Sequence, residues 1–314
     1  MRNARLLGIF SIALVISGLS ASGFAGGLKE VNPPVPADEN SLTALVGGRL
    51  IDGGGGAPVE NATVVVRGAR ILAAGSRERV VIPEGARIVD VSGMSVLPGL
   101  FDSHFHSRFT IKTPVEYELN RGITSFRDPG HPFKYYSTVM KSKETLPRVF
   151  LCGGHLDGPP PVWADQAILV TDADHARRAV NRHVDRGASA IKVYFRLPLE
   201  HVKAACDAAR ERGVLVTGHL ELVDADAAIR VGVRGIEHAT SFGTSLADPK
   251  DVERFKREIR ADSNARRKMR YWLWSRIDLD SSARVKPLLD LIVRREVFVS
   301  PTLAVFERQA GKKN

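Results

Sequence analysis

Cysteine is scarce in this sequence, and long apolar runs are missing after the first 25 residues. Two cysteines, Cys152 and Cys206, occur in 314 residues, which excludes a disulfide framework and favours buried thiols. The lack of a later run of about 18 apolar residues excludes a membrane span in the mature chain. Low-complexity tracts are also lacking and 25% of the residues are charged, so wholesale disorder is excluded. With 44% hydrophobic residues, the chain predicts a globular protein of more than one unit.

The N-terminus is typical of a secretory signal peptide. Arg2 and Arg5 precede an apolar stretch over residues 6–19, and small residues follow at 21–23 and 25. This order predicts a cleaved signal peptide over residues 1–25. The apolar stretch is short for the alternative, a membrane anchor. We therefore expect an exported protein, periplasmic or extracellular, with no stable membrane anchor after cleavage.

The formal net charge of +10 raises the question of a polyanionic partner. The excess is concentrated in residues 250–296, where Lys and Arg outnumber Asp and Glu by 14 to 8. Both signs are interspersed there on a helix-like apolar pattern, which favours a solvated helical face. No nucleic-acid-binding motif accompanies the basic residues. The sequence therefore predicts no nucleic-acid partner.

The chain after the signal peptide divides into three parts. Residues 26–41, with Pro33, Pro34 and Pro36, are typical of a linker. Residues 42–98 hold short β runs with Gly-rich turns between them, which predicts a small β-sandwich-like domain. The expected strands are residues 45–46, 62–66, 70–74, 80–82 and 87–91.

Residues 99–314 alternate buried apolar strands with helices, the pattern of a parallel sheet with right-handed crossovers. The expected strands are residues 100–104, 123–127, 148–152, 190–195, 215–219, 235–238 and 297–301. A helical basic insertion is expected at about 243–295. Seven such strands predict an α/β fold, a (β/α)8 TIM barrel that is incomplete. A doubly wound sheet is the competitor, but no Gly-rich loop follows the first strand.

Four histidines are expected at the C-terminal ends of these strands. His104 and His106 lie two residues apart on the first strand, so their side chains point to the same side. His219 ends the fifth strand and His238 ends the sixth, at the face where TIM barrels carry their sites. Imidazoles collected on rigid strands predict a metal site.

Lys192 lies inside the apolar fourth strand, next to Tyr194 on the same face. A buried lysine is costly, and burial lowers its pKa. A neutral amine can add carbon dioxide and become a carbamate, which bridges two metal ions. The alternative is a lysine whose stem packs inside while its head reaches solvent, and strand context alone leaves both open.

Further polar residues are candidates for contacting a substrate or bracing the ligands. His131 and His155 follow the second and third strands, Tyr194 faces the barrel mouth, and Arg127 and Asp128 end the second strand. Solvated loop histidines, a local ion pair and core packing are the respective alternatives. The remaining helix-borne histidines, among them His183, are interpreted as surface residues.

The motifs resemble the amidohydrolase superfamily, in particular its imidazolonepropionase-like and Xaa-Pro dipeptidase-like branch. Residues 48–53 (GRLIDG) and the signature over 97–106 (LPGLFDSHFH) carry the resemblance. Residues 122–128 (GITSFRD) resemble the second strand of the family, and residues 153–155 (GGH) resemble its third-strand loop. The resemblance covers about residues 43–308.

The resemblance implies a site with two divalent metal ions, usually zinc. His104 and His106 would bind the more buried ion, carboxylated Lys192 would bridge both, and His219 and His238 would bind the second. It also implies hydrolysis of an amide or dipeptide substrate, a small molecule. A basic insertion weakly indicates a substrate carboxylate, and a homo-oligomer is left open.

The sequence departs from the family at its end. The Asp that would carry protons at the end of an eighth strand has no match, so the catalytic residue is unknown. We expect a C-terminally truncated chain that lacks its eighth strand and is inactive as written. The alternatives are a mononuclear cyclic-amide hydrolase or deaminase, and a non-catalytic remnant.

Overall fold

The computed structural model describes residues 29–32, 37–106 and 118–309. The predicted signal peptide, residues 1–25, lies outside the described residues. Contacts divide the described residues into two compact units, residues 37–99 and residues 100–106 and 118–309 with 29–32, and each is described by itself.

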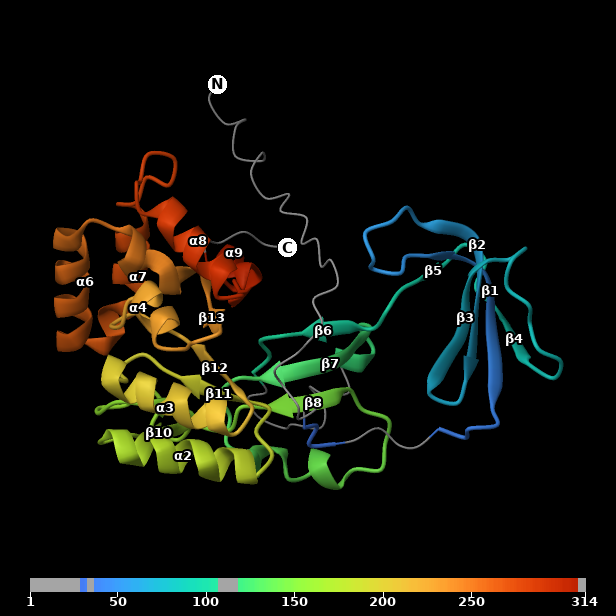
Figure 1. The fold of residues 1–314 in the computed structure, drawn as a ribbon, viewed down its shortest axis with the longest axis horizontal. Helices are drawn as coiled ribbons and strands as arrows, with labels where there is room; N and C mark the ends of the chain where they lie inside the picture. Colours follow the sequence, from blue (N-terminus) through green and yellow to red (C-terminus); the bar gives the residue numbers. More distant parts are fainter. Residues whose placement is uncertain (1–28, 33–36, 107–117, 310–314) are drawn as a thin grey trace. The chain divides into compact units, whose positions relative to one another are not determined.

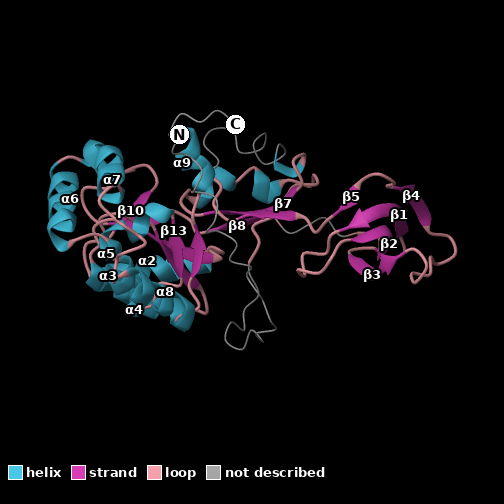
Figure 2. Cartoon of the chain, turned by 90° about the horizontal axis from the view of Figure 1, so that it is seen from above, coloured by secondary structure: helices cyan, strands magenta, loops and turns pink. Residues whose placement is uncertain are grey.

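The first unit is a five-stranded sheet, and Figure 2 shows strands without helices in its described part. Its strands are β1 (Leu42–Leu50), β2 (Val59–Arg67), β3 (Arg70–Ser76), β4 (Arg87–Asp90) and β5 (Ser95–Val96). Strands β1, β2 and β3 form an antiparallel meander, and β4 and β5 run parallel to β1. These strands form one sheet, so the second layer of a sandwich stays a prediction. Residues 80–82, expected as a strand, have no regular structure.

The second unit contains parallel strands in the predicted chain order. Its strands are β6 (Leu100–Asp102), β7 (Ile123–Asp128), β8 (Arg148–Leu151), β9 (His155–Asp157), β10 (Ala167–Leu169), β11 (Ala190–Val193), β12 (Leu215–Gly218), β13 (Gly235–Glu237) and β14 (Phe298–Ser300). They form two sheets, β6-β7-β8 and β10-β9-β11-β12-β13-β14. The predicted third strand is divided, because β8 pairs with β7 while β9 pairs with β11. The α/β class with parallel strands is confirmed, and barrel closure stays a prediction.

Helices follow most of these strands, and Figure 1 shows α2 and α3 side by side along them. The helices are α2 (Ala173–Asp185), α3 (Leu199–Glu211), α4 (Ala225–Arg230), α5 (Gly243–Leu246), α6 (Pro249–Ala261), α7 (Arg266–Trp274), α8 (Val285–Arg294) and α9 (Leu303–Gln309). Asp172 is the N-cap of α2, and its side chain accepts a hydrogen bond from the His175 backbone N–H. Helix α2 buries Ala176, Ala179 and Val180, the spacing of one helical face.

His183 on the same helix is buried, so its interpretation as a surface residue is wrong. Its Nε2 lies 2.8 Å from the Gly154 carbonyl oxygen. The position falls on the apolar face of α2, which is why the ring is covered.

The core of the second unit lies between the strands and their helices. Its largest fully buried side chains include those of Phe126, Leu151 and Ile191, each on a strand. The predicted basic insertion is helical, but α6 and α7 also form a second apolar cluster with Phe195. Their exposed faces carry the charge while their inner faces contribute to the core. No helix in the described part of the chain has the length and apolarity needed to cross a bilayer.

Part of the predicted linker is packed against β8. The backbone N–H of Val31 donates to the Val149 carbonyl at 3.0 Å. Asn32 is buried, its Nδ2 donates to the Pro147 carbonyl at 2.8 Å, and its Oδ1 accepts from the Val149 N–H at 2.8 Å. Residues 31 and 32 therefore fasten the chain to this strand.

We predict that Asn32→Ala lowers the free energy of unfolding by about 1–3 kcal/mol, because a buried N–H loses its acceptor. Urea denaturation measures the change. Asn40→Ala, at an exposed turn, is the control and should change stability by less than about 0.5 kcal/mol. Equal stability of the two variants would contradict the role of Asn32.

Candidate metal centre

His104 and His106 follow strand β6 and turn the same ring nitrogen toward each other. Their Nε2 atoms are 3.2 Å apart, and their ring centroids are 4.9 Å apart. Two hydrogen bonds donated by its backbone fix this segment. The His104 N–H donates to Asp102 Oδ1 at 2.9 Å, and the Phe105 N–H donates to the Arg127 carbonyl at 3.0 Å. Two Nε2 atoms this close suit two ligands of one cation.

The other two predicted histidines lie in the same cluster. The ring centroid of His238 is 4.6 Å from that of His104 and 4.3 Å from that of His219. His238 has a φ of 66°, a conformation that is strained for any residue except glycine and that is common at functional sites. Its Nδ1 lies 2.7 Å from Thr302 Oγ1, which leaves Nε2 available. The structure thus brings four predicted side chains from three strand ends together.

Lys192 lies on β11 and lines the same cavity as His106, His219 and His238, a space of about 240 Å³. The residue is 2% exposed. Burial lowers the pKa of the Lys192 amine to about 8, although the negative charge of Glu237 acts in the opposite direction. A buried amine with this pKa is partly neutral near pH 7.

Burial also keeps three histidines of the cluster, His104, His219 and His238, neutral. It lowers the pKa of His104 to about 4, although a hydrogen bond to Glu237 raises it. Burial lowers the pKa values of His219 and His238 well below the ordinary value, helped by Arg270 at His219 and by the neighbouring rings at His238. Neutral imidazole is the form that binds metal ions.

Glu237 is the centre of the polar network, and the residue pattern had not singled it out. It is fully buried, and its Oε2 accepts from Nδ1 of His104 at 2.6 Å. Its Oε1 accepts from Arg127 Nη2 and from Thr217 Oγ1, both at 2.5 Å. Burial would raise the pKa of Glu237, but Lys192, His104 and Arg127 hold it well below its usual value. A glutamate one residue before His238, inside a buried strand, was the signal available in the sequence.

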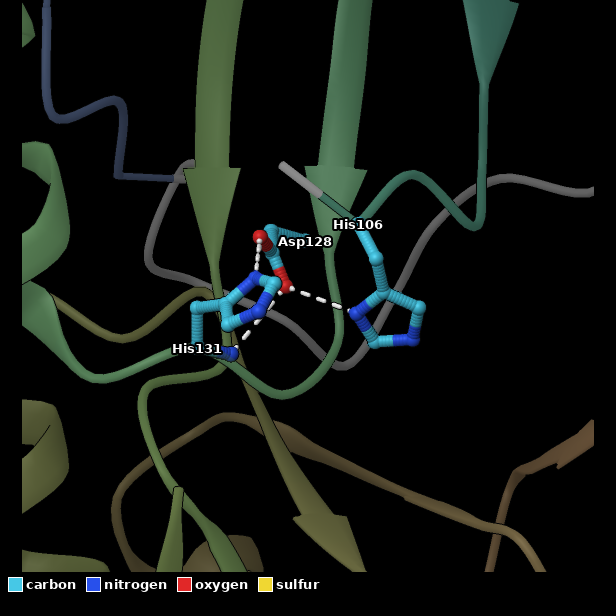
Figure 3. A group of neighbouring side chains, drawn as sticks. All are labelled: His106, Asp128 and His131. Carbon is cyan, nitrogen blue, oxygen red and sulfur yellow. Dashed lines mark hydrogen bonds and ion pairs between the residues drawn. The ribbon is translucent and has the colours of Figure 1, made fainter. Parts of the chain in front are cut away.

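Asp128 at the end of β7 holds two histidines, as Figure 3 shows. Its Oδ1 is 3.4 Å from Nδ1 of His106, and its Oδ2 is 2.7 Å from Nδ1 of His131. The Tyr136 hydroxyl and the backbone N–H groups of Gly130 and His131 also donate to it. Burial would raise the pKa of Asp128, but the two histidines lower it far more.

The group of His106, Asp128 and His131 has ligand atoms within 4.8 Å of one another and could itself hold a cation. Asp128 already accepts from several donors, so anchoring the imidazoles is the simpler role. Arg127 and Asp128 brace different partners, since Arg127 binds Glu237 and the Ser103 carbonyl. The two residues therefore support the site without pairing with each other.

His155 and Tyr194 lie beside the cluster, as expected from their strand ends. Their ring centroids are 4.3 Å apart, and Tyr194 is 4.9 Å from His219. Burial, then the charge of Lys192, lowers the pKa of His155 to about 3. Its Nε2 is buried without a hydrogen-bond partner among the described residues.

Helix α7 contributes two arginines that sequence reasoning did not place here. Arg270 Nε donates to Glu221 Oε1 at 2.8 Å, and its Nη2 is 3.3 Å from Nε2 of His219. Arg266 Nη1 donates to the Tyr194 hydroxyl at 3.3 Å. The helical pattern identified α7, but the face that docks on a distant strand end depends on tertiary packing.

No protein-family model matches the chain. An uncharacterized protein of Mycobacterium tuberculosis is 30% identical over 175 residues, which are 49% of this chain and 46% of the relative. The N-acyl-D-aspartate deacylase of Alcaligenes xylosoxydans is 40% identical over 83 residues, 26% of this chain and 16% of the relative. The chain thus spans about half the length of the first relative.

A solved structure of a Xaa-Pro dipeptidase with methionine in its active site superposes with a TM-score of 0.61. The two share 19% identity over 86% of this chain and 69% of the dipeptidase. At this identity the likeness is one of fold. Together with other solved structures, it confirms the predicted resemblance at that level.

We predict that Glu237→Gln lowers the free energy of unfolding by about 3 kcal/mol, because Arg127 keeps a buried charge without its partner. Urea denaturation at pH 7 measures it. Glu296→Gln is the matched control, since Glu296 pairs with Arg234 at the surface at 3.0 Å, where a pair contributes little. A similar small effect in both variants would show that Glu237 is not central.

We predict that the metal-free protein loses stability as the pH falls from about 6.5 to 4. The folded-state pKa of His104 is about 4 and that of His155 about 3, so the unfolded chain binds protons first. Their contribution is complete above the unfolded pKa, near 6.5, and declines below it. Urea denaturation at pH 7, 6 and 5 measures the slope, and His155→Gln should flatten it. A stability that is constant across this range would refute the argument.

Proposed function

We propose that this chain, which has the fold of the amidohydrolases, binds two divalent metal ions and hydrolyses an amide bond in a small substrate. The observation that carries the proposal is that the rings of His104, His106, His219 and His238 form one cluster. Three of them, His106, His219 and His238, line one cavity with the buried Lys192. Dipeptides and acylated amino acids are the proposed substrates. The names of the dipeptidase of similar fold and of the deacylase relative support an amide target.

The residues present fit a pair of zinc-like ions. Neutral imidazoles are preferred zinc ligands, and His104 and His106 offer Nε2 atoms 3.2 Å apart. His219 and His238 would hold the second ion. Lys192 would bridge both as a carbamate, formed when its neutral amine adds carbon dioxide. When bound, such ions supply a Lewis acid and an acidified water.

Other residues hold the ligands in place. Glu237 fixes the Nδ1 side of His104 and Asp128 that of His106, so each ring keeps its lone pair on Nε2. Thr302 does the same at Nδ1 of His238. His219 bonds Glu221 through Nε2 at 3.2 Å, which leaves Nδ1 for binding.

The site offers no obvious group to transfer protons among its described residues. The buried carboxylates nearest the cluster, Asp128, Glu221 and Glu237, are all engaged by donors. None of them is placed to take a proton from water and give it to a leaving amine. Because general acid–base catalysis contributes about 10² to 10⁴-fold, we propose that turnover is slow at a site whose nearby carboxylates are these three alone.

We also propose that the two parallel sheets form one barrel. Ser103 Oγ, after β6, lies 3.1 Å from Ser300 Oγ at the end of β14. The Arg127 guanidinium lies over the Phe298 ring at 5.4 Å. These contacts bring the first and seventh strands near each other. Export through a signal peptide over residues 1–25 completes the proposal.

Metal counting tests the proposal independently of turnover. The protein, loaded with zinc in bicarbonate buffer and desalted, should carry about two ions per chain by plasma mass spectrometry. Lys192→Ala should lose at least one ion, because the bridging ligand is gone, whereas the exposed-lysine control Lys286→Ala should keep both. Retention of both ions by Lys192→Ala, or no zinc in the native chain, would refute a bridged pair. A single ion unaffected by Lys192→Ala would favour the mononuclear alternative.

A further inference from the structure

One wall of the cavity is built of hydrogen-bond donors that the proposed hydrolysis does not use. Arg266 and Arg270 come from α7, and Tyr194 follows β11. All three line the cavity together with Lys192 and His219. Guanidinium groups carry only donors, so the wall is suited to an acceptor.

The two arginines share a single carboxylate. Glu221 Oε1 accepts from Arg270 Nε at 2.8 Å, and Glu221 Oε2 lies 3.7 Å from Arg266 Nε. All three side chains are largely buried, with exposures of 10% for Arg270, 17% for Arg266 and 1% for Glu221. The two arginines and Glu221 together carry a net charge of +1. The neighbouring Arg196 and Asp157 add one charge of each sign and leave that sum unchanged. An unpaired positive charge is costly in a buried place unless a bound anion neutralises it.

The Tyr194 hydroxyl points to the same requirement. It accepts one hydrogen bond from Trp163 Nε1 at 3.2 Å and another from Arg266 Nη1 at 3.3 Å. Both partners are donors only, so the two acceptor positions of the oxygen are filled. The hydroxyl hydrogen remains to be donated, and the cavity that Tyr194 lines is where a ligand acceptor would meet it.

We infer that this wall binds a carboxylate of the substrate, next to the amide that is cleaved. Arg270 Nη2 lies 3.3 Å from Nε2 of His219, so the anion would sit within a few ångströms of the metal ligands. In an N-acyl α-amino acid or dipeptide, one carbon separates the free carboxylate from the amide nitrogen. A cavity of about 240 Å³ also favours a compact ligand. The inference rests on the proposed function and assigns the binding of the free α-carboxylate of its substrates to Arg266, Arg270 and Tyr194.

Two probes that differ only at the carboxylate test the inference. N-acetyl-DL-alanine and N-acetyl-DL-alaninamide are titrated into the full chain, as purified and after treatment with chelator, by ligand-detected nuclear magnetic resonance. The acid should bind at least about tenfold more tightly than the amide, because its contacts with guanidinium are charge-assisted. The preference should persist without metal, since the wall consists of protein side chains alone.

Three variants locate the preference. Arg266→Met and Tyr194→Phe should each reduce the acid-to-amide ratio by about three- to tenfold, since each removes a donor that faces the anion. Arg267→Met removes the same charge from an exposed position of α7 and should leave the ratio unchanged. Tyr194→Phe keeps the ring against His155. We therefore expect this variant to fold, and its acid-to-amide ratio can be measured even if the arginine variant fails to fold.

A change at Glu221 should act in the opposite direction. Glu221→Gln removes the carboxylate that competes for both arginines, so the acid should bind more tightly than to the native chain. Equal binding of acid and amide to the native chain, or a ratio that Tyr194→Phe and Arg266→Met leave intact, would overturn the inference. Because binding is also read without metal, this failure is distinguishable from an absence of bound zinc, which would instead overturn the proposed function.

Discussion

The arrangement of the site depends on a carboxylate buried in the middle of the parallel strands. Glu237 on β13 accepts from Arg127 on β7, from Thr217 on β12 and from His104 after β6. A buried charge is stable only when it is paired and hydrogen-bonded, and here the pairing joins segments far apart in the chain. The same bonds fix the Nδ1 side of His104, so the interaction that holds the strand ends together also orients a candidate ligand.

Much of this was readable in the sequence. Alternation of apolar strands and helices predicted the parallel strands in their order, and strand ends predicted where the four histidines and Lys192 would meet. Both predictions rest on the period of two in side-chain direction along a strand and on the common edge where the carboxyl ends of parallel strands lie. The motif over residues 97–106 added the family resemblance, which the likeness of fold supports.

Other features depend on long-range contacts that local patterns do not encode. The predicted third strand is divided into β8 and β9 because its first half pairs with β7 and its second half pairs with β11. Residues 31 and 32 were predicted as linker because prolines follow them, yet they bond to Val149. The helical pattern around His183 predicts an exposed ring. The ring is buried because the apolar face of α2 packs toward Gly154, a contact that the local pattern does not encode. The docking of α7 at His219 likewise needed the folded chain.

The central proposal is that the four clustered histidines and Lys192 surround a pair of metal ions. Anomalous X-ray diffraction at the zinc edge, from crystals grown with zinc and bicarbonate, tests it most directly. The account predicts two peaks, one against His104 and His106 and one against His219 and His238, with density for a carbamate on Lys192 between them. A single peak held by His106, Asp128 and His131, or no peak near Lys192, would contradict it.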